Sequence, residues 1–342
     1  MQLFNKLSKK ERLDLINKAG EKRLNLSFYK YSKIKNTSIF RNFLFVYLDK
    51  LNVLGRIYIA SEGINAQLSV PASKLVEFKN LIDSISFLKG VRLNIAIEHN
   101  NDAFLKLKIK IKEKIVADGL NLNDYDLDVH GKHVNAEEFN ALLEEKNTIT
   151  IDIRNHYESE VGHFKGANLP DVDTFRESLP LIKNKYKSCK KNRKILMYCT
   201  GGIRCEKASA YLLNNGFKNV YQLNGGIVEY ARQVKVNKIE NKFIGKNFVY
   251  DNRLGERISN DIISKCHQCG EKCDEHTNCN NEACHLLFIQ CENCKKKYDG
   301  CCSKKCNEIN SMPIEKQKKF RKEEKNSNKI FRKGRFKKTT IN

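Results

Sequence analysis

The chain has 342 residues, more than one ordinary domain, so two or three domains with real cores are expected. No segment approaches about 18 consecutive apolar residues and the N-terminus lacks the apolar core of a signal peptide, so we expect a soluble, cytoplasmic protein and not a membrane or secreted one. Lys and Arg outnumber Asp and Glu by 63 to 40, a net charge of +23 that favours a polyanionic partner such as RNA, although a Lys-rich proteome would give the same excess.

Residues 1–24 carry a charged helical pattern, and strand and helix patterns alternate from residue 25 to 120. Strands are predicted at Leu26–Tyr31, Phe43–Leu48, Gly55–Ala60, Asn65–Val70, Arg92–Ile97 and Leu105–Val116, with a helix before Phe43 and another from Ala72 to Ile85. This order predicts a small α+β domain of the ferredoxin or acylphosphatase type.

The last of these strands alternates strictly between apolar and basic residues. Its basic face carries a row of four ammonium groups, from Lys106, Lys108, Lys110 and Lys112. Such a row is either the solvated face of a half-buried strand or a surface that contacts an RNA phosphate backbone, and the sequence leaves both open.

Residues 121–128 are polar and are predicted to link to a second domain over residues 129–236. Its strands are predicted at Val129–Val134, Thr148–Ile153, Ile195–Cys199 and Val220–Leu223, and its helices at 136–145, at 206–214 and after Gly225-Gly226. This alternation predicts a doubly wound parallel sheet. Asp152 and Arg154 end one buried strand, where they either orient the neighbouring loop or simply pair with each other.

The strand Ile195–Tyr198 delivers Cys199 into a loop that precedes a helix. Glycines let backbone N–H groups point into one concavity, and the helix adds its positive end. Together with the Arg204 guanidinium, such a setting favours the thiolate, so Cys199 is a candidate nucleophile. The loop consists of Thr200, Gly201, Gly202 and Ile203. A buried, inert cysteine at a strand end is the alternative.

Only four residues separate Cys199 from Arg204, one fewer than in Cys-dependent phosphatases, so the cradle suits a single sulfur or a peroxide-like group better than phosphate. The next residue after Arg204 is Cys205. It either resolves an oxidised or persulfidated Cys199 or is a small helix residue.

Ten cysteines lie in a module predicted over residues 237–310: Cys266, Cys269, Cys273, Cys279, Cys284, Cys291, Cys294, Cys301, Cys302 and Cys306. Without a secretion signal, disulfides are disfavoured, whereas the pairs Cys266/Cys269 and Cys291/Cys294 have the spacing that binds one tetrahedral Zn²⁺. Structural zinc is the leading interpretation, with an iron–sulfur cluster or metal-free redox thiols as alternatives. Residues 311–342 are predicted to form a disordered basic tail that binds phosphate backbones or is merely solvated.

Four runs of the second domain resemble a rhodanese domain: Asp152–Glu158, Gly162–Ala167, Cys199–Arg204 and Leu223–Ile227. With residues 55–69, 106–119 and 245–253, the chain is similar over about residues 25 to 310 to the bacterial tRNA uridine-34 hydroxylase family. The resemblance implies formation of 5-hydroxyuridine in the tRNA anticodon loop with molecular oxygen as co-substrate. It also implies that activity depends on the rhodanese cysteine, here Cys199.

The chemistry leaves other functions open. A rhodanese loop by itself indicates a sulfurtransferase that carries a cysteine persulfide, and the charge is compatible with a non-catalytic RNA-binding protein. The sequence shows no recognisable flavin, haem or 2-His-1-carboxylate iron motif that would activate oxygen.

Overall fold

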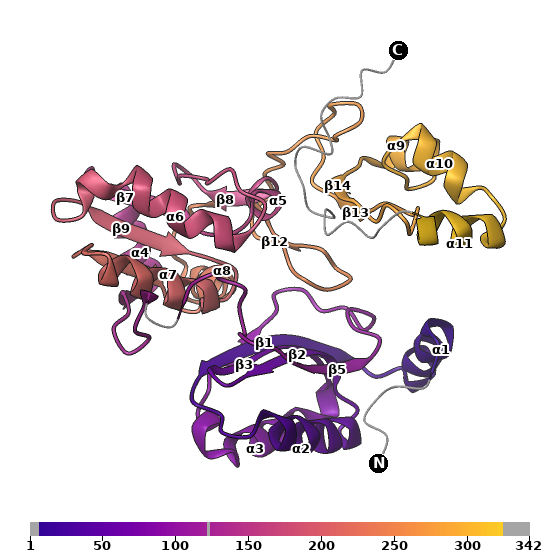
Figure 1. Cartoon of the computed structure of the whole chain (residues 1–342), viewed down its shortest axis with the longest axis horizontal. Helices are drawn as coiled ribbons and strands as arrows, with labels where there is room; N and C mark the ends of the chain where they lie inside the picture. The colour runs from indigo at the N-terminus through magenta and orange to yellow at the C-terminus, as the bar shows by residue number, and fades with distance from the viewer. Residues whose placement is uncertain (1–6, 122–123, 324–342) are drawn as a thin grey trace.

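The computed structural model describes residues 7–121 and 124–323 (Figure 1). The first region comprises helix α1 (Lys9–Ala19), strand β1 (Arg23–Tyr31), helix α2 (Thr37–Lys50), strands β2 (Leu54–Ala60) and β3 (Gly63–Pro71), helix α3 (Leu75–Asp83), and strands β4 (Asn94–Ile95) and β5 (Leu107–Ile111). Its sheet has the order β4-β1-β3-β2-β5. The first four strands are antiparallel, and β5 pairs in parallel with β2. Helices α2 and α3 cover one face, and the other faces the rest of the chain (Figure 1), which confirms the predicted α+β fold.

The strand predicted at Phe43–Leu48 is wrong, because these residues form the second half of helix α2. The Asn36 side chain accepts a hydrogen bond from the N–H of Ile39 and starts the helix. A short apolar run fits a buried strand or a buried helix face equally well. Here the buried members are Leu44, Phe45 and Leu48, a spacing that places them on one side of a helix.

The second region comprises β6 (Lys132–Val134), α4 (Ala136–Glu144), β7 (Thr148–Asp152), α5 (His156–Ser159), β8 (Gly162–Phe164), α6 (Phe175–Lys185), β9 (Lys194–Tyr198), α7 (Ile203–Asn214), β10 (Val220–Leu223) and α8 (Gly226–Asn237). Its parallel sheet has the order β6-β10-β9-β7. Met197 packs with α6 and α7 on one face, while Leu196 packs with α4 and α8 on the other. Helices on both faces confirm the doubly wound sheet.

The third region begins with β11 (Phe243–Asn247), which pairs with β8 and with β12 (Glu256–Arg257). It continues with the hairpin β13 (His276–Asn278) and β14 (Leu287–Ile289), then helices α9 (Glu292–Lys297), α10 (Lys304–Asn310) and α11 (Ile314–Glu323).

Part of the tail predicted as disordered is therefore helical. Pro313 precedes α11, where its missing N–H costs no helical hydrogen bond, and the Lys, Glu and Gln residues that follow favour helix. Residues 324–342 of the predicted tail lie outside the described residues. Among the residues that the structure describes, no helix is both long and apolar enough to span a membrane.

Candidate active site at the Cys199 loop

Cys199 directly follows β9 and stands before the N-terminus of α7. The helix begins at Ile203, three residues before the predicted start at residue 206, with Gly202 as its N-cap at φ 100°, a conformation that L side chains rarely adopt. The N–H of Gly202 donates to the Cys199 sulfur at 3.1 Å. The loop therefore places the sulfur where backbone donors and the helix dipole favour negative charge.

The electrostatics of the loop favour the thiolate. Complete burial, the largest influence, raises the pKa of Cys199. It is outweighed by hydrogen bonding from the Cys205 thiol, the positive charge of Arg204 and the backbone N–H groups of Arg204 and Cys205, which together lower the pKa to about 6. For the neighbouring Cys205, burial and the interaction with Cys199 raise the pKa well above the usual thiol value. One cysteine of the pair is thus predisposed to be thiolate and the other to be thiol.

Arg204 is held beside the loop by a buried carboxylate. Its two terminal nitrogens bind the oxygens of Glu158 at 2.6 and 2.7 Å, and one of them also reaches the Thr200 hydroxyl at 3.3 Å. Glu158 additionally accepts from the Tyr250 hydroxyl at 2.8 Å and from the N–H of Asn155 at 3.0 Å. Burial raises the pKa of Glu158, but the charge and hydrogen bonds of Arg204 overcome this and hold it below the usual value.

The first region forms a roof over the loop. The Tyr29 hydroxyl lies 2.8 Å from where a side-chain carbon at Gly202 would stand, and it donates to Glu206 at 3.0 Å. The Asn94 side chain donates to the carbonyl of Gly201 at 3.4 Å. Under this roof Cys199 is only 1% exposed.

A buried ionic cluster locks the first region to the second. Lys207 of α7 is completely buried and binds both Glu62, from the β2–β3 turn, and Asp118. The ammonium group also lies 5.7 Å from the ring centroid of Tyr31 and 5.3 Å from that of Tyr125. Because α7 also carries Arg204 and Cys205, this lock fixes the site relative to the first region.

Asp152 and Arg154 pair with each other, which is the alternative that the sequence left open. Both side chains are completely buried, and Arg154 binds Asp152 at 2.6 Å and the carbonyl of Gly162 at 2.6 Å. The pair therefore links the end of β7 to the start of β8.

The four lysines of the basic row are all exposed. Lys108 and Lys110 pair in register with Arg56 and Tyr58 of β2. Repulsion from Lys110, followed by burial and by the charges of Lys106 and Arg56, lowers the pKa of Lys108. The row is thus part of a concentrated positive patch.

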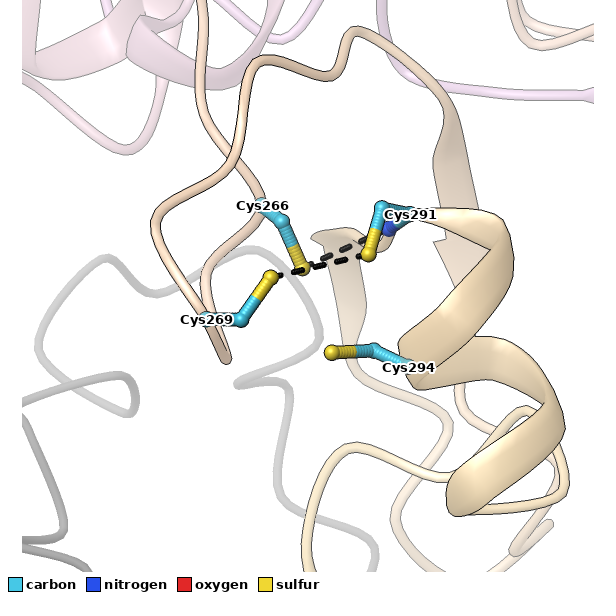
Figure 2. Close-up of side chains that lie close together, drawn as sticks. All are labelled: Cys266, Cys269, Cys291 and Cys294. Atoms are coloured by element: carbon cyan, nitrogen blue, oxygen red, sulfur yellow. Dashed lines mark hydrogen bonds between the residues drawn. The ribbon is translucent and has the colours of Figure 1, made fainter.

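The predicted set Cys266, Cys269, Cys291 and Cys294 converges in space. The first two come from a loop and the last two from the start of α9, and all four sulfurs point toward one another (Figure 2), within 4.8 Å. The Cys269 and Cys291 sulfurs are 3.6 Å apart, and the N–H of Cys291 donates to the Cys266 sulfur (Figure 2).

The sequence did not identify a second set of the same kind. Cys279, Cys284, Cys302 and Cys306 also lie within 4.8 Å of one another, with S···S separations of 3.7 Å for Cys284–Cys302 and 3.6 Å for Cys302–Cys306. A tetrahedron with metal–sulfur bonds of about 2.3 Å has edges of about 3.8 Å, so both sets have the dimensions of a four-thiolate metal site. The eight cysteines of the two sets are not joined by disulfides.

Sequence reasoning assigned no role to Glu158, Tyr250 or Lys207. The first two lay within runs noticed only for their resemblance to a family, and nothing in the spacing indicated that Tyr250 reaches Glu158. Glu158 and Tyr250 are 92 positions apart, so their contact is visible only in the folded chain.

Three family models match the chain: the UPF0176 acylphosphatase-like domain at residues 23–115, the rhodanese-like domain at 135–233 and the rhodanese C-terminal region at 244–307. A rhodanese-like domain from Anabaena is 22% identical, covers 33% of this chain and 78% of that chain, and superimposes with a TM-score of 0.26.

Relatives match over nearly the whole length. A protein of Leptospira interrogans named tRNA uridine(34) hydroxylase is 52% identical, covering 92% of this chain and 85% of its own. One of the same name from Pectobacterium carotovorum is 49% identical, covering 97% of this chain and 94% of its own. With this identity across all three regions and a Cys199 loop built as described, the chain belongs to the tRNA uridine(34) hydroxylase family.

Proposed function

We propose that this protein hydroxylates uridine 34, the wobble position of tRNA, to 5-hydroxyuridine in the cytoplasm, with molecular oxygen as co-substrate and Cys199 as the essential residue. The observation that carries the proposal is the setting of Cys199, a buried sulfur with a pKa lowered to about 6, in a chain about half identical to relatives named for this reaction.

The chemistry proposed for Cys199 is nucleophilic addition. A thiolate that adds to C6 of the uracil ring makes C5 electron-rich, which splits a difficult oxidation into easier steps. Oxygen transfer to C5 releases the second oxygen atom as water and consumes two electrons from a reductant. Arg204 stabilises the thiolate, the backbone N–H groups of Gly202, Arg204 and Cys205 hold it, and Cys205, as a neutral thiol, reduces an oxidised Cys199.

We further propose that tRNA binds along the face of the first sheet that α2 and α3 leave uncovered, from its β5 edge toward the Cys199 loop. In-register pairing places Lys108, Arg56, Gln67, Ser27 and Asn94 in one row across this face. The row starts at the basic edge strand β5 and ends at Asn94, which contacts Gly201 of the Cys199 loop.

A parallel row supports the same path. It runs from Lys110 through Tyr58 and Asn65 to Tyr29, which lies over Gly202. Lysine and arginine side chains bind phosphates, and tyrosines stack on unpaired bases, so these rows suit an anticodon loop whose base 34 is turned toward the sulfur.

We propose that each four-cysteine set holds a structural zinc ion. The donor set and its dimensions fit Zn²⁺, and in each set one backbone N–H donates to a sulfur, from Cys291 to Cys266 and from Cys302 to Cys279. Zinc would tie the loop before β13 to α9 in the first set, and the β13–β14 turn to α10 in the second.

The decisive experiment is nucleoside mass spectrometry of tRNA from cells that contain the protein, lack it, or carry Cys199→Ser, with Cys189→Ser as the matched control outside the site. We expect 5-hydroxyuridine to be lost in the deletion and in Cys199→Ser and kept in Cys189→Ser. Unchanged 5-hydroxyuridine in the deletion would overturn the proposal. If thiolated uridine falls instead, the protein is a sulfurtransferase, the function that the rhodanese-like match at residues 135–233 otherwise favours.

A further inference from the structure

Two histidines that are close in sequence and a glutamate that is distant from both meet beside the Cys199 loop, outside the chemistry proposed above. His130 lies in the turn before β6, His133 lies on β6, and Glu206 lies on α7 directly after Cys205. One potential ligand atom from each lies within 4.8 Å of the other two. We propose that His130, His133 and Glu206 form a binding site for a divalent transition-metal ion such as Fe²⁺ or Co²⁺.

The distances suit such an ion. Metal bonds to imidazole nitrogen and carboxylate oxygen are about 2.0 to 2.2 Å long, so two neighbouring ligand atoms on one ion stand about 3 Å apart. Nε2 of His133 and Oε1 of Glu206 are 2.9 Å apart. The His130 ring centroid is 4.9 Å from that of His133, and because His130 is exposed, its side chain is free of core packing that would oppose a small approach.

The surrounding hydrogen bonds are those that orient metal ligands. Nδ1 of His130 lies 3.1 Å from the carbonyl of Gly131, and because a carbonyl only accepts, this contact fits the tautomer that offers Nε2 to a metal ion. Gln222 donates to the second oxygen of Glu206 at 3.0 Å and leaves the first toward His133. The N–H of Gly131 donates to Ser209 of α7 at 2.9 Å, which fixes the histidine turn against the helix that carries Glu206.

An ion can enter the site and keep free coordination positions. The His133 side chain is 32% exposed and that of Glu206 is 14% exposed. Two histidines and one carboxylate supply three ligands, and this donor set with open positions is typical of non-haem Fe²⁺. The sequence revealed no such motif because the third ligand lies on another element, 73 positions from His133.

The site adjoins the Cys199 loop through Glu206. Oε1 of Glu206 also accepts from the Tyr29 hydroxyl, which stands over Gly202. An ion bound to Glu206 therefore changes the charge at the oxygen that accepts the Tyr29 hydrogen bond. The inference concerns binding alone and does not depend on the proposed hydroxylation.

The test is a Co²⁺ titration of the full-length protein, followed by absorbance, after both cysteine sets have been filled with zinc. Cobalt held by nitrogen and oxygen gives weak visible bands, whereas cobalt held by thiolates adds intense charge-transfer bands in the near ultraviolet. We expect one further equivalent of Co²⁺ with the weak bands alone. His130→Ala and His133→Ala should each weaken its binding at least about tenfold, and Lys132→Ala, an exposed neighbour on the same strand, should bind as the parent does.

His130→Ala decides the matter even if His133→Ala fails to fold, because His130 is exposed and its loss creates no cavity. Thermal unfolding of both variants checks the fold. The proposal is overturned if no Co²⁺ binds beyond the zinc-filled sets, if only charge-transfer bands appear, or if His130→Ala binds Co²⁺ as tightly as the parent.

Discussion

Arg204 and Glu158 should move the pKa of Cys199 in opposite directions. An opposite charge within about 4 to 6 Å lowers the pKa of an acid by about 1 to 3 units. Replacing Arg204 with Met should therefore raise the pKa of Cys199 from about 6 by at least about 1 unit, or about 1.4 kcal/mol. At about pH 6.5 the thiolate fraction then falls from roughly three-quarters to roughly one-quarter.

Glu158→Gln removes the anion that partly neutralises Arg204, so the pKa of Cys199 should stay at about 6 or fall. Arg232→Met is the control, because this arginine is exposed on α8 and pairs with Glu229. The assay is alkylation of Cys199 by iodoacetamide, followed on its own peptide by mass spectrometry between about pH 5 and 9, a range that spans the shifted and the ordinary thiol pKa.

The rate of alkylation rises with the thiolate fraction, so the midpoint of the rate plotted against pH reports the pKa of Cys199. Burial of the sulfur slows the reaction at every pH and does not move this midpoint. An unchanged midpoint in Arg204→Met, or equal upward shifts in Arg204→Met and Glu158→Gln, would refute the electrostatic reasoning. A shift in Arg232→Met would show that the assay reports something other than the local charge.

Three further outcomes are expected. Lys207→Met should lower the free energy of unfolding in urea by about 3 to 5 kcal/mol, because Glu62 and Asp118 are left buried without their cation. Adding Glu62→Gln and Asp118→Asn to this variant should recover much of the loss. No recovery would contradict the ionic lock. Cys269→Ser and Cys302→Ser should each lower the zinc content by about one equivalent, whereas Cys273→Ser, outside both sets, should not. A full zinc content in Cys269→Ser or in Cys302→Ser would disprove zinc binding by the set to which that cysteine belongs. Lys108→Glu with Lys110→Glu should weaken tRNA binding and flatten its salt dependence, while Lys79→Glu, on helix α3 across the sheet, should leave both unchanged.

Local patterns determined how much of the fold could be predicted. The helix predicted at 136–145 forms behind a capping box of Asn135 and Glu138, and the Gly225-Gly226 turn opens α8 as expected, because a cap or a tight turn depends on residues that are neighbours in sequence. Phe43–Leu48 failed because a continuous apolar run carries no period, and the helix was decided by its Asn36 cap and by packing on the sheet.

The candidate site divides in the same way. Cys199, Arg204 and the glycines between them lie in one short loop, so their convergence was predictable. The Glu158–Tyr250 contact, the Lys207 lock and the second cysteine set join residues up to 145 positions apart, and only the tertiary fold brings them together. Cys266/Cys269 and Cys291/Cys294 were recognisable because each half of the set has its own short spacing.

The roof over Cys199 has a consequence for a protein proposed to use oxygen. A thiolate at neutral pH is the form that peroxides oxidise, and further oxidation to the sulfinic acid is irreversible in most proteins. Here the sulfur is buried, and Tyr29 and Asn94 lie against Gly202 and Gly201 of its loop. Base 34 must then displace or pass these two side chains to reach it. The movement that admits the base is also the movement that exposes the sulfur, so the thiolate is protected from oxidants while the loop is closed.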